Sequence, residues 1–287
     1  MQKSKTRSEI LRRLSEGDPV FTRKEYSDVV TMFWDTVEAC PDQLALVEGG
    51  RSLSYAQFGA AVAGLAARIS QIVPPSGRVA ICIPNSIEAN VAIYAALSAG
   101  AEISTANAEY TPRELGALFE IAPPGLVLAG ERNSNVAGEA ADNAHAQLIT
   151  VGEGGIAIEQ LLDTQPTRPE VKITGESPCI IMFTGGSTGT PKGVQRSHRS
   201  EMSIIKAMHT AWPTRDQEEV WLNVAPISHV WGTHMGCFNP VYGRSPLIIV
   251  PRFQPDLVAR LMEEHRVSVF SGGPAAIYQG LLAAPDT

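Results

Sequence analysis

The residues best suited to chemistry form one short stretch that follows an apolar run and is crowded with glycine, serine and threonine. Glycines allow backbone turns that other residues avoid, and they let amide groups approach an anion closely. Hydroxyl groups add hydrogen-bond donors, and a lysine adds positive charge. The stretch therefore predicts a phosphate-binding loop. Its candidate phosphate-binding residues are Thr184, Gly185, Gly186, Ser187, Thr188, Gly189 and Lys192.

Two commoner nucleotide loops do not fit this stretch. The Walker pattern requires serine or threonine after the lysine, whereas Gly193 follows Lys192, and the pattern GxGxxG is absent from this stretch. A surface turn with incidental glycines is the alternative. The ordered run of small residues directly after the apolar strand disfavours that alternative.

Histidines supply the other candidate groups. His229 stands in the stretch PISHVWG, and His234 follows five residues later, which is off the i,i+4 spacing that places two metal ligands on one helical face. A lone histidine is more often a structural core residue than a functional one. His198 and Arg199 follow the loop and could either approach phosphate or form local contacts.

The elements that must position these residues alternate between short apolar runs and amphipathic segments. Strands separated by helix-length segments predict parallel sheets covered by helices on both faces, that is, an α/β fold. Ser86 and Thr111 stand at helix starts as N-caps, the second followed by Pro112. The expected strands are 78–83, 102–105, 125–130, 146–151, 179–184, 219–225, 245–250 and 267–270, and the expected helices are 86–100, 111–122 and one that starts near residue 198.

The chain divides by pattern into three parts. A charged N-terminal extension covers 1–25, a first α/β subdomain 26–178, and a second α/β subdomain with the glycine-rich loop 179–287. Its 287 residues can bury a large apolar core. The net charge of −7 and pI near 5.4 argue against a nucleic-acid or anionic membrane partner. We find no membrane span and no CxxC pair among four scattered cysteines, and we expect a cytoplasmic protein.

The segment FTGGSTGTPKGV (183–194) resembles the signature [YF]TSG[ST]TGxPKGV of the adenylate-forming superfamily, which includes acyl-CoA synthetases, 4-coumarate:CoA ligases, firefly luciferase and adenylation domains of nonribosomal peptide synthetases. Gly185 departs from the commoner serine. Further segments are similar to those of CoA ligases in the same order, and the resemblance covers roughly 30–286. They are RSLSYAQF (51–58), SAGAEISTANAEYTPRELGALF (98–119), NVAPISHVWG (223–232) and the stretch from 247 to 286.

The resemblance implies an acid:thiol ligase that uses ATP, Mg²⁺ and coenzyme A. The loop would hold the β- and γ-phosphates, with Thr184 also assigned to the metal, while the carboxylate attacks the α-phosphorus. His229 would contact the acyl carboxylate, and Val230 and Trp231 would line the acyl pocket, although core packing is an equal alternative for Trp231. An aromatic or medium-chain acid is favoured, and many relatives resemble dimers.

Members of the superfamily continue beyond the point that corresponds to residue 287, with a YGxTE motif, a ribose-binding aspartate and a small C-terminal domain that carries a further lysine. Because these are absent from the 287 residues, we expect an incomplete N-terminal portion that is inactive alone, and Lys192 does not take that lysine's role. Two alternatives remain open. One is a nucleotide-binding or regulatory module without turnover, and the other is a fragment without function.

Overall fold

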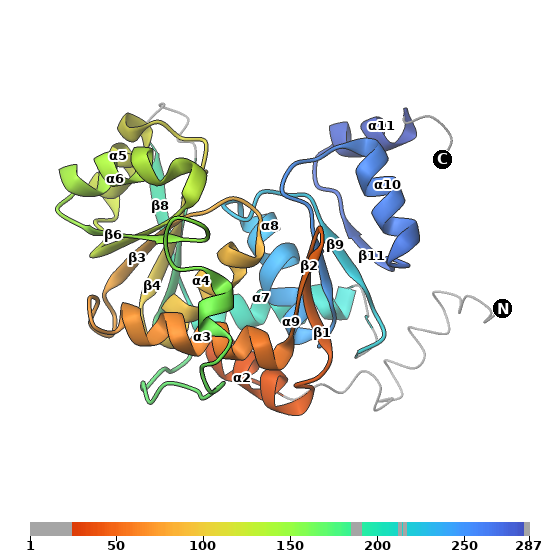
Figure 1. The fold of residues 1–287 in the computed structure, drawn as a ribbon, viewed down its shortest axis with the longest axis horizontal. Helices are drawn as coiled ribbons and strands as arrows, with labels where there is room; N and C mark the ends of the chain where they lie inside the picture. Colours follow the sequence, from red (N-terminus) through yellow and green to blue (C-terminus); the bar gives the residue numbers. More distant parts are fainter. Residues whose placement is uncertain (1–24, 185–190, 212–213, 215–216, 284–287) are drawn as a thin grey trace.

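The computed structural model describes residues 25–184, 191–211, 214 and 217–283, and it contains two β-sheets with helices around and between them (Figure 1). One sheet has six strands in the order β6-β5-β3-β4-β7-β8, and the other has five in the order β11-β9-β10-β1-β2. The strands are β1 (Leu44–Glu48), β2 (Arg51–Ser54), β3 (Arg78–Cys82), β4 (Glu102–Thr105), β5 (Leu126–Gly130), β6 (Gln147–Val151), β7 (Pro178–Thr184), β8 (Lys192–Ser197), β9 (Trp221–Asn223), β10 (Leu247–Ile249) and β11 (Val269–Ser271).

The α-helices cover both sheets, and the described residues also contain short 3₁₀ and π segments. Helix bounds are α2 (Val29–Ala39), α3 (Tyr55–Ile69), α4 (Ile87–Ser98), α5 (Pro112–Ile121), α6 (Ser134–Asn143), α7 (His198–Ala211), α8 (Val230–Thr233), α9 (Asn239–Tyr242), α10 (Pro255–Glu264) and α11 (Ala275–Leu282). The 3₁₀ segments are η1 (Glu131–Asn133) and η2 (Ile158–Leu161), and η3 (His234–Phe238) is a π-helix between α8 and α9.

Strand β3 shows why helices cover both faces of the six-stranded sheet. Side chains alternate along a strand, so Val79 and Ile81 belong to the core cluster that contains α4. Ala80 and Cys82 belong instead to the cluster formed with α5 and α6. The predicted α/β class with helices on both faces is thereby confirmed, and each of the eight predicted strands has its counterpart.

The sheets, which were predicted to be parallel, each carry one antiparallel strand at an edge. β2 pairs antiparallel with β1, and β8 pairs antiparallel with β7, so both sheets are mixed. None of β1, β2 and β8 was expected as a strand. In β8 the sequence KGVQRS is polar and mostly exposed, and an edge strand of this kind lacks the apolar run that identifies a buried one. An antiparallel edge strand next to a parallel sheet is common in this class of fold.

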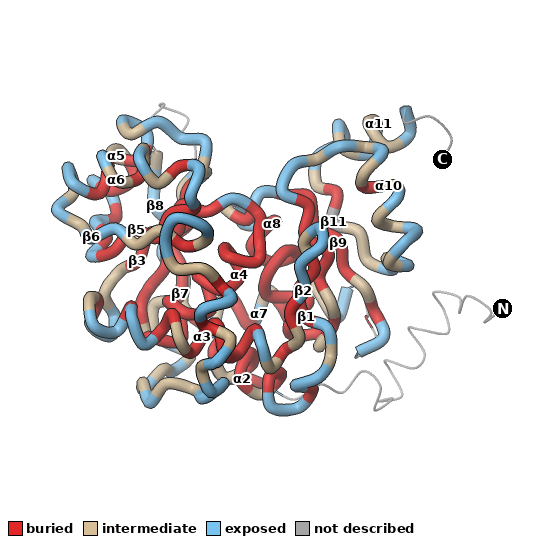
Figure 2. Tube along the Cα trace, in the orientation of Figure 1, coloured by how far each residue is buried: buried red, intermediate tan, exposed pale blue. Residues whose placement is uncertain are grey.

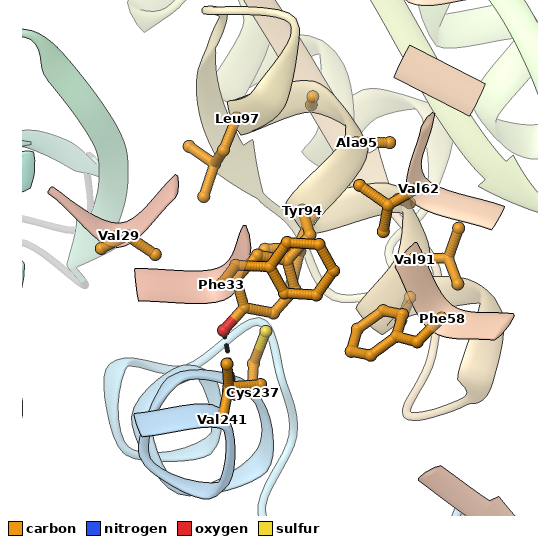
Figure 3. Close-up of a cluster of buried hydrophobic side chains, with 14 of the residues drawn as sticks. Val29, Phe33, Phe58, Val62, Val91, Tyr94, Ala95, Leu97, Cys237 and Val241 are labelled. Carbon is orange, nitrogen blue, oxygen red and sulfur yellow. Dashed lines mark hydrogen bonds between the residues drawn. The ribbon is translucent and has the colours of Figure 1, made fainter. Parts of the chain in front are cut away.

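Helix α4 lies between the two sheets and is buried on every side. All of its residues are buried, which explains why its sequence shows no polar face (Figure 2). Tyr94 at its centre stacks on Phe33 of α2 with 4.3 Å between ring centroids. Its hydroxyl donates a hydrogen bond of 3.3 Å to the carbonyl oxygen of Cys237 in η3 (Figure 3). The aromatic core therefore fixes η3 against the helices between the sheets.

The helix starts follow the predicted signals. The Ser86 side chain accepts a hydrogen bond from the amide of Ala89. Thr111 and Glu114 form a reciprocal capping box, with Pro112 in the first turn. The four cysteines are free and buried, as expected. No helix in the described residues is long and apolar enough to cross a membrane.

The division of the chain between the sheets differs from the predicted subdomains. β7 and β8 follow residue 178 and belong to the six-stranded sheet, whereas β1 and β2 precede it and belong to the five-stranded sheet. The sheets therefore do not follow the predicted boundary at residue 178. Of the predicted extension 1–25, all but Glu25 lies outside the described residues.

His198, the first residue of α7, predicts a pH dependence of stability. Burial lowers the pKa of its imidazole from 6.5 to about 4. Between these values the unfolded chain binds a proton that the folded chain does not, so stability is lost as the pH falls below 6.5. We expect a decrease of about 2 kcal/mol in the free energy of unfolding between pH 7 and pH 5, measured by urea denaturation.

The variant His198→Asn should lack this part of the pH dependence because it removes the titrating ring. His145→Asn is the matched control, since His145 is exposed and its ring is solvated in the folded and unfolded chain alike. Equal pH slopes for the original chain and His198→Asn would show that His198 does not cause the effect.

Candidate active site

The glycine-rich stretch lies in the sequence between β7 and β8, which pair antiparallel as the two arms of a hairpin. Thr184 ends β7 and lies opposite Lys192, which begins β8. The Thr184 hydroxyl lies 3.5 Å from the Lys192 carbonyl oxygen, and both residues are exposed. β7 is parallel to β4, so Thr184 lies at the carboxyl ends of the parallel strands. That edge is where open α/β sheets bind their ligands.

Five of the predicted phosphate-binding residues lie outside the described part of the chain. For these, only the two strands that frame them can be placed. They are Gly185, Gly186, Ser187, Thr188 and Gly189.

The segment that carries His229 follows the carboxyl end of β9 in the other sheet. Asn85, which lies just beyond the end of β3, holds this segment from the side of the six-stranded sheet. Its side-chain oxygen accepts a hydrogen bond of 2.8 Å from the amide of Ile227, and its amide group donates one of 2.9 Å to the carbonyl of Ala225. Asn85 is 7% exposed, so these bonds form in a dry environment. The carboxyl ends of the two sheets are thus joined at this segment.

A second contact brings the His229 segment next to the hairpin. The hydroxyl of Thr105, the last residue of β4, lies 3.3 Å from the carbonyl oxygen of Ser228 and 3.9 Å from the sulfur of Met182 in β7. Ser228 directly precedes His229, and Met182 lies two residues before Thr184. The structure therefore brings together the candidate acid-binding histidine and the strand that enters the phosphate loop.

The position of His229 fixes which nitrogen carries its proton. His229 is the N-cap of α8, and its Nδ1 accepts a hydrogen bond of 3.2 Å from the amide of Trp231. An Nδ1 that accepts cannot carry a proton, so the neutral ring has its proton on Nε2. The exposed side chain therefore presents an N–H donor at Nε2. A donor of this kind suits a carboxylate or phosphate oxygen.

Trp231 and Val230 have different surroundings. Trp231 is partly buried and lines a cavity of about 870 Å³ together with Met235 and Phe270. Val230 is exposed and is not among the described residues that line this cavity. Trp231 therefore lies where an acyl group could be bound, and it also packs against the main core cluster. The core packing of Trp231 is thus observed, and its assignment to an acyl pocket stays a prediction.

Sequence reasoning missed Asn85 and Thr105. Both stand at or just after the ends of predicted parallel strands, and this position was the available signal, because such ends meet at one edge of a sheet. The tertiary contacts to the His229 segment could not be inferred, since they join residues more than 120 positions apart.

We expect Asn85→Leu to destabilise the chain by about 1–3 kcal/mol, because the amide of Ile227 would be left buried without a partner, while the carbonyl of Ala225 would keep only its hydrogen bond from Asn223. The free energy of unfolding from urea denaturation measures the loss. Asn133→Leu is the matched control, because buried Asn133 donates to the carbonyl of Cys82 without touching the His229 segment. The control should lose stability but keep the environment of His229. A loss below 1 kcal/mol for Asn85→Leu would contradict the predicted clamp.

Comparison with known proteins places this geometry in a family. A ligase from Mycobacterium tuberculosis named 3-[(3aS,4S,7aS)-7a-methyl-1,5-dioxo-octahydro-1H-inden-4-yl]propanoyl:CoA ligase is 30% identical over 270 residues, which is 87% of this chain and 52% of that protein. A medium/long-chain-fatty-acid–CoA/3-oxocholest-4-en-26-oate–CoA ligase from Mycolicibacterium smegmatis is 26% identical over 281 residues, with 87% and 51% covered. The chain spans about half the length of these curated relatives.

Solved structures show the same fold. The N-terminal domain of FACL13 from Mycobacterium tuberculosis superposes with a TM-score of 0.79 at 23% identity, covering 91% of this chain and 66% of that one. ATP-bound MatB from Rhodopseudomonas palustris gives a TM-score of 0.80 at 24% identity, covering 91% and 52%. The family described as AMP-binding enzyme matches residues 33–287. On this match, the chain belongs to the AMP-binding enzyme family.

Proposed function

We propose that this chain carries the phosphate-binding and carboxylate-binding part of an enzyme that activates a carboxylic acid with ATP and transfers the acyl group to coenzyme A. The observation that carries the proposal is the contact of Thr105 with both Ser228 and Met182, which sets the His229 segment beside the hairpin that holds Lys192. A reaction between a carboxylate and a nucleotide phosphate needs both groups bound at one place.

The proposed reaction has two steps. First, a carboxylate oxygen attacks the α-phosphorus of ATP, the bond between that phosphorus and the bridging oxygen breaks, and pyrophosphate leaves with the bonding electrons. The product is an acyl-adenylate. Next, the sulfur of coenzyme A attacks the acyl carbon, AMP leaves, and the thiol proton passes to solvent. Neither step changes an oxidation state.

Lys192 has the charge and position to hold the leaving pyrophosphate. It is exposed at the start of β8, at the mouth of the hairpin. The Thr184 hydroxyl is exposed on the opposite strand. It could bind Mg²⁺ directly through its oxygen or form a hydrogen bond with a water molecule that the Mg²⁺ holds. The metal would neutralise charge on the polyphosphate. The described residues contain no group of three or more His, Cys, Asp and Glu side chains that could hold a metal ion, so most ligands of the Mg²⁺ would come from phosphate and water.

The acyl group would enter the cavity beside Trp231. A volume of about 870 Å³ lies in the upper part of the range for small-molecule sites, about 300–1,000 Å³. Trp221, Met235 and Phe270 give it apolar walls. Both relatives described above are named for bulky or long acyl groups, and we propose an aromatic or medium-chain acid for this chain.

Trapping with hydroxylamine tests the proposal without requiring coenzyme A. The enzyme that carries this part is incubated with magnesium ATP, hydroxylamine and one acid at a time from a panel of aromatic and aliphatic acids, and hydroxamate and pyrophosphate are measured. Acid-dependent hydroxamate supports acyl-adenylate formation. ATP binding by calorimetry without hydroxamate from any acid would favour a nucleotide-binding module. If neither ATP binding nor hydroxamate were detected, the proposal would be overturned.

His229→Ala is expected to lower the rate of acid-dependent pyrophosphate release about 10- to 100-fold while leaving the affinity for magnesium ATP within about two-fold, because the Nε2 donor acts on the acid and not on the polyphosphate. Single-turnover pyrophosphate release and calorimetry measure the two quantities. His265→Ala is the control, since His265 ends α10, away from the hairpin. Loss of ATP affinity in His229→Ala would place this histidine in the phosphate site instead.

A further inference from the structure

A buried carboxylate connects the two halves of the proposed site. Glu201 lies in the first turn of α7, and its side chain is fully buried. One carboxylate oxygen lies 2.7 Å from Nε of Arg196 in β8, and the other lies 2.9 Å from Nε2 of His234 in η3. These separations are those of ion-pairing groups, and neither contact has the angles of a hydrogen bond.

The two partners of Glu201 belong to the two segments that the reaction must bring together. Arg196 is four residues beyond Lys192 on the same strand, and His234 is five residues beyond His229 in the same run of helix. A helix rises about 1.5 Å per residue, so His229 and His234 are about 7–8 Å apart along its axis. Glu201 is thus a bridge between the strand of the phosphate loop and the helix whose N-cap is His229.

The other ionisable groups near Glu201 in the described part of the chain do not supply a positive charge that could balance its carboxylate. Burial lowers the pKa of neighbouring His198 to about 4, so His198 is neutral at pH 7. Burial also raises the pKa of the Cys179 thiol on β7, so Cys179 carries no charge either. Asp28, the other acidic group near His198, accepts hydrogen bonds from Ser27 and Thr31. Arg196 is therefore the permanent positive charge paired with Glu201.

The π-helix that contains His234 is held on its other side by the aromatic core. Tyr94 donates a hydrogen bond to the carbonyl of Cys237, three residues beyond His234 (Figure 3). The π-helix therefore has an anchor to α4 through Tyr94 and an anchor to α7 through His234. Segments of π-helix are found frequently at functional sites. Loss of the second anchor would let α8 rotate and would move its N-cap, His229.

We propose that Glu201 is a positioning residue that holds the His229 helix in register with the Lys192 strand through His234 and Arg196. The inference rests on the proposed function, because it assigns the two sides of the site to the acid and to the polyphosphate. It predicts that weakening this bridge affects a ligand that occupies both sides far more than one that occupies the phosphate side alone.

The test compares two probes on the 287-residue chain by calorimetry. Magnesium pyrophosphate occupies the phosphate side, and octanoyl- and cinnamoyl-sulfamoyladenosine mimic an acyl-adenylate. Glu201→Gln should lower the affinity for the better acyl-sulfamoyladenosine at least about 10-fold and that for magnesium pyrophosphate less than about two-fold, because small displacements of a reacting group have large effects. Glu102→Gln is the matched control: Glu102 is buried, pairs with Arg78 and accepts a hydrogen bond from Gln195, so it contacts the Lys192 strand without pairing with His234.

A spectroscopic signature separates positioning from a loss of stability. The chain has six histidines, so ¹⁵N-histidine labelling gives a resolvable spectrum. In Glu201→Gln the His229 nitrogens should shift towards the average of the two tautomers, and in Glu102→Gln they should not. His234→Phe should reproduce the loss of acyl-sulfamoyladenosine affinity and the shift of the His229 nitrogens. His234→Gln should keep most of the affinity, because its side-chain amide can still donate to the Glu201 carboxylate.

The possible failures are distinguishable. If the original chain binds neither probe, the proposed function fails. If the original chain and Glu201→Gln bind both probes with equal affinity and the His229 spectrum is unchanged, the positioning role is overturned while the proposed function stands. Equal losses of affinity for both probes with a lower melting temperature would overturn it as well, since they indicate a purely structural ion pair. If Glu201→Gln does not fold, the two His234 variants decide between these outcomes.

Discussion

Gly232→Ala is expected to destabilise the chain by more than about 3 kcal/mol and to abolish acyl-adenylate formation, because overpacking against backbone cannot be relieved by a side-chain rotation. A Cβ at Gly232 would lie 2.8 Å from the carbonyl oxygen of Ala225 and closer still to that of Pro226. Both carbonyls belong to the segment that Asn85 clamps. Either the chain unfolds or α8 moves away, and His229 moves with it.

The matched control is Gly116→Ala in α5, where a Cβ would meet no atom within 4 Å. Alanine is a better helix former than glycine, so this variant should gain about 0.5–1 kcal/mol. Urea denaturation of the three proteins measures both effects with one method. A fully stable Gly232→Ala that still forms hydroxamate would show that the turn at residues 225–232 is less constrained than its packing indicates.

Lys192→Ala is expected to lower the rate of acid-dependent pyrophosphate release about 100- to 1,000-fold, as removal of one preorganised charge-stabilising donor does in other active sites. Its affinity for magnesium pyrophosphate should fall about 10- to 100-fold, because a hydrogen bond to a charged group contributes about 1.5–3 kcal/mol. Calorimetry and single-turnover pyrophosphate release measure the two effects.

Lys206→Ala is the control for the charge change. Lys206 lies on α7 and pairs with Glu25 at 2.7 Å, away from the hairpin. It should bind magnesium pyrophosphate as the original chain does. If both lysine variants lost affinity equally, the effect would come from the overall charge of the protein, and the assignment of Lys192 to the phosphate site would be rejected.

The sequence predicted the elements that local pattern controls. The five parallel strands of the six-stranded sheet and the caps at Ser86 and Thr111 follow from alternation and capping chemistry, which act over a few residues. It missed β1, β2 and β8. For β2 and β8 the reason is that an exposed edge strand depends on its pairing partner and not on an apolar run. It also placed a subdomain boundary at residue 178. The five-stranded sheet takes β1 and β2 from before this residue, and the six-stranded sheet takes β7 and β8 from after it.

The candidate site shows the same limit. The sequence by itself determined the types of group available, a phosphate loop with Lys192 and a histidine at 229. Only the tertiary structure decided that Thr105 and Asn85 join the His229 segment to the ends of β4 and β3, and that Glu201 lies between Arg196 and His234. The reason is physical: local propensity acts between neighbours in the chain, whereas these contacts depend on the packing of two sheets around α4.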